Sequence, residues 1–376
     1  MKKYLFVFGT RPEAIKMLPV FKAFKRTNLD TYLCITAQHR EMLDQVLDFF
    51  QVTADYDLDL MTPGQSLNSL SAKILVEFDE ILDVLNPDYV FVHGDTTTSS
   101  MCALSSFHKR IEVVHIEAGL RTYNKYSPFP EEINRQITGR ISSMHFAPTE
   151  WAKENLLREG VQAENIVVSG NTVIDALLEG ERILDLGFTN SSLEEIKGLI
   201  ETIPNYILVT GHRRENFGEG FINVCNALRK VAEDLSIHII YPVHLNPNVQ
   251  DPVHQILHEI PNIHLITPVD YPSFLYLMKN SKLILTDSGG VQEEAPSLGK
   301  PVLVMRDNTE RPEAVNAGTV KLVGTDPSKI FKEISKLLSS SEYYMSMSNA
   351  KNPYGDGRAS SRILNYFLHE EVISNS

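Results

Sequence analysis

The chain has 376 residues, of which 43% are hydrophobic and 22% are charged, so two globular domains rather than one are the default expectation. Its formal net charge of −13 argues against a general affinity for nucleic acid or anionic membranes, because both attract basic proteins. The three cysteines follow no CxxC or metal-binding spacing, and no apolar run is long enough for a signal-peptide core or a membrane span. We therefore expect a soluble, cytoplasmic protein with reduced thiols.

Short apolar runs alternate with helix-like segments through the first half of the chain. The expected strands are residues 3–9, 31–36, 89–93, 113–116, 143–147 and 166–169. The expected helices are residues 12–26, 39–50, 66–85, 96–108 and 131–140. Strand and helix alternating in this way predict a parallel, doubly wound sheet.

The same pattern begins again in the second half of the chain. Its expected strands are residues 206–210, 237–241, 263–266, 283–285, 301–304 and 320–323. The motif Gly9-Thr10-Arg11 after the first strand has a counterpart, Gly211-His212-Arg213, after the strand that opens this half. We expect an α/β protein of two Rossmann-like, doubly wound domains joined near residues 170–175, with the ligand in the cleft between two facing sheets.

Two common nucleotide-binding signatures are missing. Neither half has GxGxxG after its first strand, and GxxxxGK[ST] occurs nowhere in the chain. Nicotinamide-dependent redox chemistry and P-loop hydrolysis are therefore disfavoured.

An anion site is expected in the stretch LILTDSGGVQEE, residues 283–294. Its apolar run ends in a turn that contains Ser288, Gly289 and Gly290, and a helix is expected over residues 291–298. Glycines allow backbone N–H groups to approach a ligand closely, and a helix N-terminus carries partial positive charge. The stretch therefore predicts a phosphate site.

Three carboxylates stand where strands end or a helix begins in the first half: Asp95, Glu117 and Glu131. Converging carboxylates could supply an acid and a base of different pKa. Two of them also have structural alternatives. Asp95 could act as an N-cap, and Glu131 could compensate a helix dipole and pair with Arg135. Glu117 follows an apolar strand and has no evident structural role, so it is the strongest catalytic candidate.

Basic residues stand at corresponding positions in both halves. Arg11 and Lys16 flank the first strand-helix junction, His212 lies at the equivalent junction of the second half, and Arg311 follows later. Such residues suit a diphosphate. The alternative is an ordinary solvated helix end, which we favour for Arg214.

Several motifs occur in one order along the chain. They are GTRPEAIK at residues 9–16, QHR at 38–40, HGDT at 93–96, HIEAGLR at 115–121, PEEINR at 130–135, GHRREN at 211–216 and DSGGVQEEAP at 287–296. Together they resemble the non-hydrolysing UDP-N-acetylglucosamine 2-epimerases of bacteria, and the match runs to about Thr325. Dispersed motifs of this length are specific as a set, although any one alone would not be.

The resemblance implies a glycosyltransferase-B fold. Residues 1–170 would form the first domain, completed by a C-terminal helix over 358–376, and residues 171–357 would form a second domain that binds UDP. It implies interconversion of UDP-N-acetylglucosamine and UDP-N-acetylmannosamine for surface polysaccharide, with no cofactor or required metal. The family route eliminates UDP to give 2-acetamidoglucal and then adds UDP back. A homodimer is the family expectation.

The resemblance also implies roles for site residues. Asp95, Glu117 and Glu131 would be the acid/base set, with His212 beside them. The expected phosphate and substrate ligands are Arg11, Lys16, Arg135, His212, Ser288, Gly289, Gly290 and Arg311. Glu294 would accept hydrogen bonds from ribose, and Phe274 would stack on uracil, for which a core aromatic is the alternative.

One departure and three alternatives remain. Some members carry Arg-Gln where this chain has Gly64-Gln65, and that Arg helps bind an activating second substrate molecule, so Gly64 puts allosteric activation in doubt. A hydrolysing relative that releases N-acetylmannosamine and UDP, and a retaining glycosyltransferase, share the fold. A nucleotide-sugar-binding regulator without turnover is disfavoured because the acidic set is intact.

Overall fold

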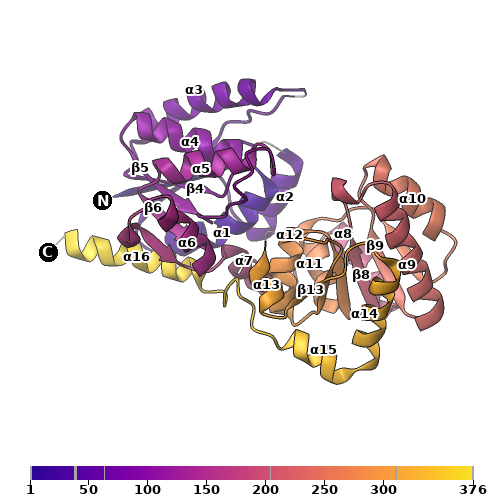
Figure 1. The fold of residues 1–376 in the computed structure, drawn as a ribbon. Coiled ribbons are helices and arrows are strands. Elements are labelled where there is room, and N and C mark those ends of the chain that lie inside the picture. Colours follow the sequence, from indigo (N-terminus) through magenta and orange to yellow (C-terminus); the bar gives the residue numbers. More distant parts are fainter. Residues whose placement is uncertain (1, 38–39, 63, 204, 310, 375–376) are drawn as a thin grey trace. The chain divides into compact units, whose positions relative to one another are not determined.

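The chain forms two compact units in a computed structural model that describes residues 2–37, 40–62, 64–203, 205–309 and 311–374, with side chains to residue 369 (Figure 1). The first unit comprises residues 1–180 and 354–376, and the second comprises 181–353. The junction expected near residues 170–175 lies at the start of helix α7 (Thr172–Asp185), whereas the units divide within this helix. Gln38 and His39 of the QHR motif lie outside the described residues.

The first unit is built on a parallel sheet with the strand order β3-β2-β1-β4-β5-β6-β7. Its strands are β1 (Lys3–Phe8), β2 (Asp30–Ile35), β3 (Tyr56–Asp57), β4 (Tyr89–His93), β5 (Glu112–Ile116), β6 (Met144–Ala147) and β7 (Ile166–Val168). Its helices are α1 (Arg11–Lys25), α2 (Arg40–Phe50), α3 (Leu67–Leu85), α4 (Thr97–His108), α5 (Glu131–Ile141), α6 (Glu150–Arg158), the 3-10 turn η1 (Ala163–Asn165), most of α7, and α16 (Ala359–Ser374).

The last helix completes the core of the first unit. In α16, the buried ring of Phe367 lies 5.8 Å from Tyr4 and 5.7 Å from Phe24, measured between ring centroids. It also lies 5.2 Å from both Tyr89 and Phe91. Aromatic pairs at these distances add to the free energy gained from apolar burial. The yellow α16 therefore packs with the indigo and magenta elements of this unit (Figure 1).

The second unit has the parallel strand order β10-β9-β8-β11-β12-β13. Counted from its own first strand, this is the order 3-2-1-4-5-6 of a Rossmann sheet. Its strands are β8 (Tyr206–Thr210), β9 (His238–Pro242), β10 (Ile263–Ile266), β11 (Leu283–Thr286), β12 (Val302–Val304) and β13 (Val320–Leu322). Its helices are α8 (Ser191–Glu201), η2 (Arg214–Asn216), α9 (Glu219–Leu235), α10 (Pro247–Leu257), α11 (Tyr271–Asn280), α12 (Gly289–Glu294), η3 (Ala295–Leu298), α13 (Pro312–Asn316), α14 (Pro327–Ser339) and α15 (Ser341–Ser348).

The expected strands are all present, and β4, β8 and β10 have the predicted bounds. Some elements of the chain were missed and one was misplaced. Strand β3, which pairs with the end of β2, and helix α6 were not predicted. The helix expected over residues 291–298 begins at Gly289, so Gly289 and Gly290 are its first residues rather than part of the turn. Ser288 takes the extended N-cap conformation, and the N–H of Gln292 donates to its carbonyl oxygen.

Each sheet reverses its winding at a central strand pair, β1 with β4 in the first unit and β8 with β11 in the second. The loops after these strands therefore emerge side by side at the carboxyl edge, which is where such sheets bind ligands. No helix in the described part of the chain is long and apolar enough to cross a membrane. Among the same residues, no group of His, Cys, Asp and Glu side chains is arranged to hold a metal ion.

Candidate active site

The buried carboxylate of Glu13 connects the loops that follow β1 and β4, the strand pair at which the first sheet reverses its winding. Glu13 Oε2 accepts hydrogen bonds from the backbone N–H of Gly9 (3.1 Å) and from the N–H and hydroxyl of Thr10 (both 2.8 Å). Glu13 Oε1 accepts from the hydroxyls of Thr96 (2.6 Å) and Ser99 (3.1 Å). Burial nevertheless raises the pKa of Glu13, because it opposes the charge more than these donors favour it. One side chain thus ties the loop after β1 to the loop after β4.

Glu117 stands directly after β5 at the centre of a polar cluster. Its Oε2 forms an ion pair with Lys16 Nζ on α1 and accepts a hydrogen bond of 3.0 Å from Asn171 Nδ2. The same oxygen lies 3.7 Å from Nε2 of the buried His93. The N–H of Asn171 donates to the carbonyl of Tyr354, so the returning C-terminal segment helps to hold the cluster. Groups from four parts of the sequence therefore orient one carboxylate.

The backbone at Glu117 is unusual for a residue with a side chain. Its φ is 58°, in the left-handed region that costs L-residues about 1–2 kcal/mol. Gly119, with φ of 94°, has no room for a Cβ atom, which would lie 2.2 Å from the carbonyl oxygen of Ala152. Strain held in place by close packing is characteristic of functional sites. This backbone is consistent with the catalytic role expected for Glu117.

Asp95 and Arg135 form an ion pair through Oδ2 and Nη2. Arg135 Nη1 lies 3.3 Å from Oε2 of Glu132, which is fully buried. Although burial acts to raise the pKa of Glu132, donation from Thr122, Tyr123, Gln136 and the nearby Arg135 lowers it overall. The buried carboxylate of Glu132 thus holds Arg135 in place while Arg135 contacts the candidate catalytic residue Asp95.

The structure contradicts the N-cap alternative for Asp95 and the ion pair with Arg135 for Glu131, whereas Glu131 does stand in the first helical turn, where it can compensate the helix dipole. The N-cap of α4 is Thr96, whose hydroxyl accepts from the N–H of Ser99, so Asp95 is not the cap. Glu131 does not pair with Arg135. It is a half-buried first-turn residue of α5, and its side chain makes no hydrogen bond or ion pair within the described part of the chain. Its carboxylate is therefore available to a ligand.

In the second unit, where the winding reverses between β8 and β11, the completely buried Asp287 follows β11. Asp287 Oδ2 accepts from the backbone N–H groups of His212 (2.9 Å) and Arg213 (2.8 Å). Its Oδ1 lies 3.3 Å from Nδ1 of the His212 ring. Burial lowers the pKa of His212, although the neighbouring Asp287 carboxylate acts to raise it. The ring also stacks on His244, with centroids 5.7 Å apart.

Gly289, two residues after Asp287, lies against the guanidinium group of Arg311. A Cβ atom on Gly289 would lie 2.7 Å from the guanidinium carbon of Arg311, so the guanidinium packs directly against this glycine. Arg311 Nε donates to Oε1 of the buried Glu293 over 2.8 Å. The N–H of Ser288 donates to the hydroxyl of Thr286 over 2.9 Å. A larger side chain at Gly289 would displace the expected phosphate ligand Arg311.

Two expected nucleoside contacts lie on α11 and α12. Glu294 is buried, and its charge helps to raise the pKa of Tyr271, for which burial is the larger cause. Phe274 is half-buried rather than a member of the buried core, so the core-aromatic alternative is disfavoured.

Comparison with known proteins identifies the family. A family model described as UDP-N-acetylglucosamine 2-epimerase matches residues 22–368. The chain belongs to this family. The UDP-N-acetylglucosamine 2-epimerase of Escherichia coli (strain K12) is 54% identical over 373 residues, which cover 98% of this chain and 99% of the relative.

Solved structures agree with this assignment. The UDP-GlcNAc 2-epimerase from Neisseria meningitidis, bound to UDP-GlcNAc, superposes with a TM-score of 0.89 at 49% identity, covering 98% of this chain and 100% of that one. The Methanocaldococcus jannaschii UDP-GlcNAc 2-epimerase in complex with UDP-GlcNAc and UDP gives 0.80 at 36% identity, covering 98% and 100%. The chain is therefore an enzyme of this family, and the expected fold class of two Rossmann-like domains of the glycosyltransferase-B type is confirmed.

The structure groups some of the expected site residues and adds others. Lys16 contacts Glu117, and Arg135 contacts Asp95. In the second unit, Gly289 contacts Arg311. The residues that were not predicted are Glu13, His93, Asn171 and Asp287. A sequence signal existed for Glu13, because T-x-x-E before an apolar helix is a capping box and Thr10 and Glu13 form one.

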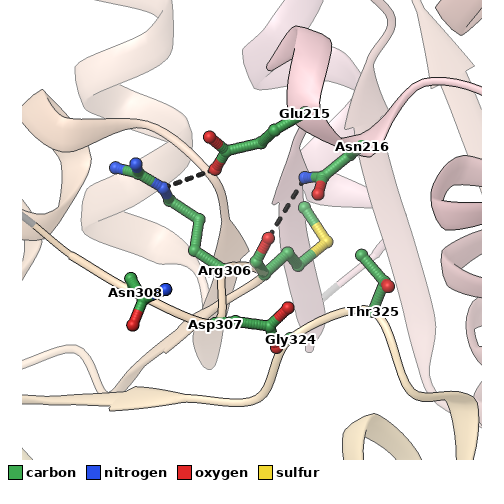
Figure 2. A pocket seen from close by; sticks show the side chains of 8 residues that line it. Glu215, Asn216, Arg306, Asp307, Asn308, Gly324 and Thr325 are labelled. Carbon is green, nitrogen blue, oxygen red and sulfur yellow. Dashed lines mark hydrogen bonds and ion pairs between the residues drawn. The ribbon is translucent and has the colours of Figure 1, made fainter. Parts of the chain in front are cut away.

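A pocket of about 230 Å³ opens beside η2 at the carboxyl ends of β12 and β13 (Figure 2). It is lined by Glu215, Asn216, Met305, Arg306, Asp307, Asn308, Gly324 and Thr325, none of which was an expected site residue. Figure 2 shows Arg306 Nε donating to Glu215 (2.6 Å) and Asn216 donating to the carbonyl of Met305 (3.1 Å). Because the guanidinium of Arg306 is paired with the carboxylate of Glu215, we assign no phosphate to this pocket.

Proposed function

We propose that the chain interconverts UDP-N-acetylglucosamine and UDP-N-acetylmannosamine by inverting C2 of the sugar without net hydrolysis. Family membership over nearly the whole chain carries this proposal. The relatives from Neisseria meningitidis and Methanocaldococcus jannaschii were solved with UDP-GlcNAc, and the second also with UDP, which supports the same substrate here.

The proposed route is elimination followed by re-addition. In the first step the C2–H and C1–O bonds break, a C1=C2 double bond forms, and UDP leaves with the electron pair of the C1–O bond. The product is 2-acetamidoglucal. In the second step UDP adds back to C1, and a proton is delivered to the opposite face of C2. Inversion therefore requires at least two positioned acid/base groups.

We assign the proton chemistry to the first unit. Glu117 is supported by its orientation, since Lys16, Asn171 and His93 surround one of its oxygens. Glu131 is supported as a second group by its lack of competing polar partners among the described residues. Asp95, paired with Arg135, completes the set. Arg11, the half-buried first residue of α1, is proposed to contact the departing diphosphate.

We assign UDP binding to the second unit. The diphosphate is proposed to lie at His212, Ser288, Gly289, Gly290 and Arg311, because a leaving group that must stay bound needs cations and backbone donors. The half-buried Phe274 is proposed to stack on uracil, and Glu294 to accept hydrogen bonds from the ribose hydroxyls.

The deciding experiment incubates the protein with UDP-N-acetylglucosamine in D2O and follows the sugar by NMR. Deuterium at C2 of UDP-linked N-acetylmannosamine is the expected result. Free N-acetylmannosamine with UDP would point to hydrolysis, and unchanged substrate would contradict both reactions. Because elimination breaks the C1–O bond, 18O placed in that bridge should also move into non-bridging positions of the β-phosphate. Retention of the label in the bridge would contradict elimination with a β-phosphate that turns freely before UDP adds back.

The cellular compartment, the oligomeric state and the pathway that uses the product are also proposed. We place the reaction in the cytoplasm, in keeping with the three buried free cysteines. The homodimer and the supply of N-acetylmannosamine units to surface polysaccharide follow from the family expectation. Size-exclusion chromatography with light scattering tests the dimer, and a monomeric mass would refute it.

A further inference from the structure

The contact between Asp287 and His212 is set by the sheet rather than by local sequence. Thr210 and Thr286 are paired residues at the ends of β8 and β11, and their hydroxyl oxygens lie 2.6 Å apart. The next residues on both strands therefore leave the sheet side by side. Asp287 uses one oxygen for the N–H groups of His212 and Arg213 and turns the other toward His212 Nδ1.

This geometry favours one of the two ring nitrogens of His212 as the carrier of the proton. Oδ1 of Asp287 is buried, has no hydrogen-bond partner within the described part of the chain and lies 3.3 Å from His212 Nδ1, so the carboxylate charge favours a proton on Nδ1 over one on Nε2. The neighbouring His244 has the opposite arrangement, since its Nδ1 accepts from the N–H of Asn246 over 3.1 Å. With Nδ1 protonated, Nε2 of neutral His212 carries a lone pair and can donate only after it gains a proton.

We propose that Asp287 is a positioning residue that holds the His212 proton on Nδ1 and thereby couples diphosphate binding to the uptake of one proton at Nε2. The identity of the anion rests on the proposed function. A phosphate oxygen can accept a hydrogen bond but cannot donate one when fully ionised, so it is complementary to the imidazolium and not to the neutral ring. Asp287 neutralises the charge that forms on the ring.

The charged groups around the ring agree with this coupling. The Asp287 carboxylate favours the imidazolium, while Arg213, His244 and partial burial oppose it. The balance lowers the pKa of His212 in the free protein, so the ring is mainly neutral above neutral pH and has a proton to gain. Affinity for the diphosphate should be constant below the pKa of the free ring. It should then fall up to tenfold per pH unit, until the pKa of the ring in the complex is passed.

The first test determines the His212 tautomer by NMR of 15N-histidine-labelled protein, without ligand, with H212Q used to assign the signals. The expected neutral form carries its proton on Nδ1. In D287N the amide oxygen can keep the two backbone N–H groups while the amide nitrogen donates to Nδ1, so the proton should move to Nε2. A wild-type ring with its proton on Nε2 would overturn the proposal. The wild-type measurement needs neither turnover nor a folded variant of Asp287.

The second test measures proton uptake on UDP binding by calorimetry in buffers of different ionisation enthalpy. The terminal phosphate of UDP also titrates near neutral pH, so the uptake measured with H212Q is subtracted. At one pH unit above the pKa of the free ring, the wild type should take up close to one further proton. D287N should take up no further proton, and its UDP affinity should not show the tenfold fall per pH unit. H244Q should take up the further proton and keep the fall in affinity.

The outcomes separate the two proposals. UDP binding by the wild type with no uptake beyond that of H212Q would refute the coupling and leave the proposed function standing. Absence of UDP binding to the wild type would contradict the proposed function, and the tautomer would still decide the role of Asp287.

Discussion

Replacing Glu13 by alanine should destabilise the first unit by about 2–6 kcal/mol. The substitution removes the acceptor for the N–H groups of Gly9 and Thr10. An unsatisfied buried donor costs about 1–3 kcal/mol, and two donors give the range stated. The hydroxyls of Thr96 and Ser99 lie 3.1 Å apart and can bond each other, so they add little. Water reaching the partly buried Thr10 favours the lower end of the range.

The isosteric variant E13Q is the matched control. Its amide oxygen can accept from both N–H groups, and its amide nitrogen can donate to the two hydroxyls, so at low pH its stability should be close to wild type. Burial raises the pKa of Glu13 in the folded protein, so the stability that its protonated form provides is lost as the pH rises through that value. The glutamine has no such dependence. E13Q should therefore gain stability relative to wild type as the pH rises through the folded pKa of Glu13.

Urea unfolding of the first unit can be followed selectively, because the single tryptophan, Trp151, lies on α6. With an m-value of about 2 kcal/mol/M, E13A should lower the midpoint by roughly 1–3 M. An E13A midpoint equal to that of wild type would refute the assigned role of Glu13. Equal losses in E13A and E13Q would show that the charge, rather than an acceptor in the right place, is what matters.

Three further predictions follow from the described contacts. E117Q should lose turnover by at least about 100-fold in the D2O assay while calorimetry shows UDP affinity near wild type, and full activity would contradict its role as an acid/base group. Burial lowers the pKa of His145 from 6.5 to about 4, so only the unfolded chain binds a proton between these values. Wild-type stability should therefore fall by about 3 kcal/mol more than that of H145N between pH 7 and pH 4 in urea titrations, and parallel pH profiles would count against this. G119A should cost at least about 2 kcal/mol more than G160A, because both glycines have positive φ but only the Cβ at Gly119 meets the carbonyl of Ala152. Equal unfolding midpoints for these two variants would refute the steric reason.

The strands could be predicted because parallel strands buried on both faces need uninterrupted apolar residues. The burial of β1 and β4 matches that requirement. Strand β3 has two residues, one of them Asp57, and pairs only with β2 at the edge of the sheet, so no apolar run announces it. The start of α12 was misplaced because glycine usually marks a turn, whereas here Ser288 takes the N-cap position and Gly289 is already helical.

The site was predictable where a residue's neighbours along the chain define its role. Glu117 could be singled out because a charge directly after an apolar strand has few structural uses. Asp95 and Thr96 are both residue types that cap helices, and only the backbone shows that Thr96 does so. Asp287 bonds a residue 75 positions away, and Asn171 reaches Glu117 across 54 positions. Such pairings depend on strand order, which local sequence does not encode.

The return of α16 to the first unit has a consequence for synthesis on the ribosome. The second unit, residues 181–353, is contiguous and can be complete before α16 is made. The first unit cannot, because the ring of Phe367 that packs on Tyr4 and Phe24 is made only after the whole of the second unit. Domains generally fold from the N-terminus as the chain emerges. Here the order of completion is reversed, so the nascent first unit keeps one side of its aromatic core open until the inserted unit and α16 have both emerged.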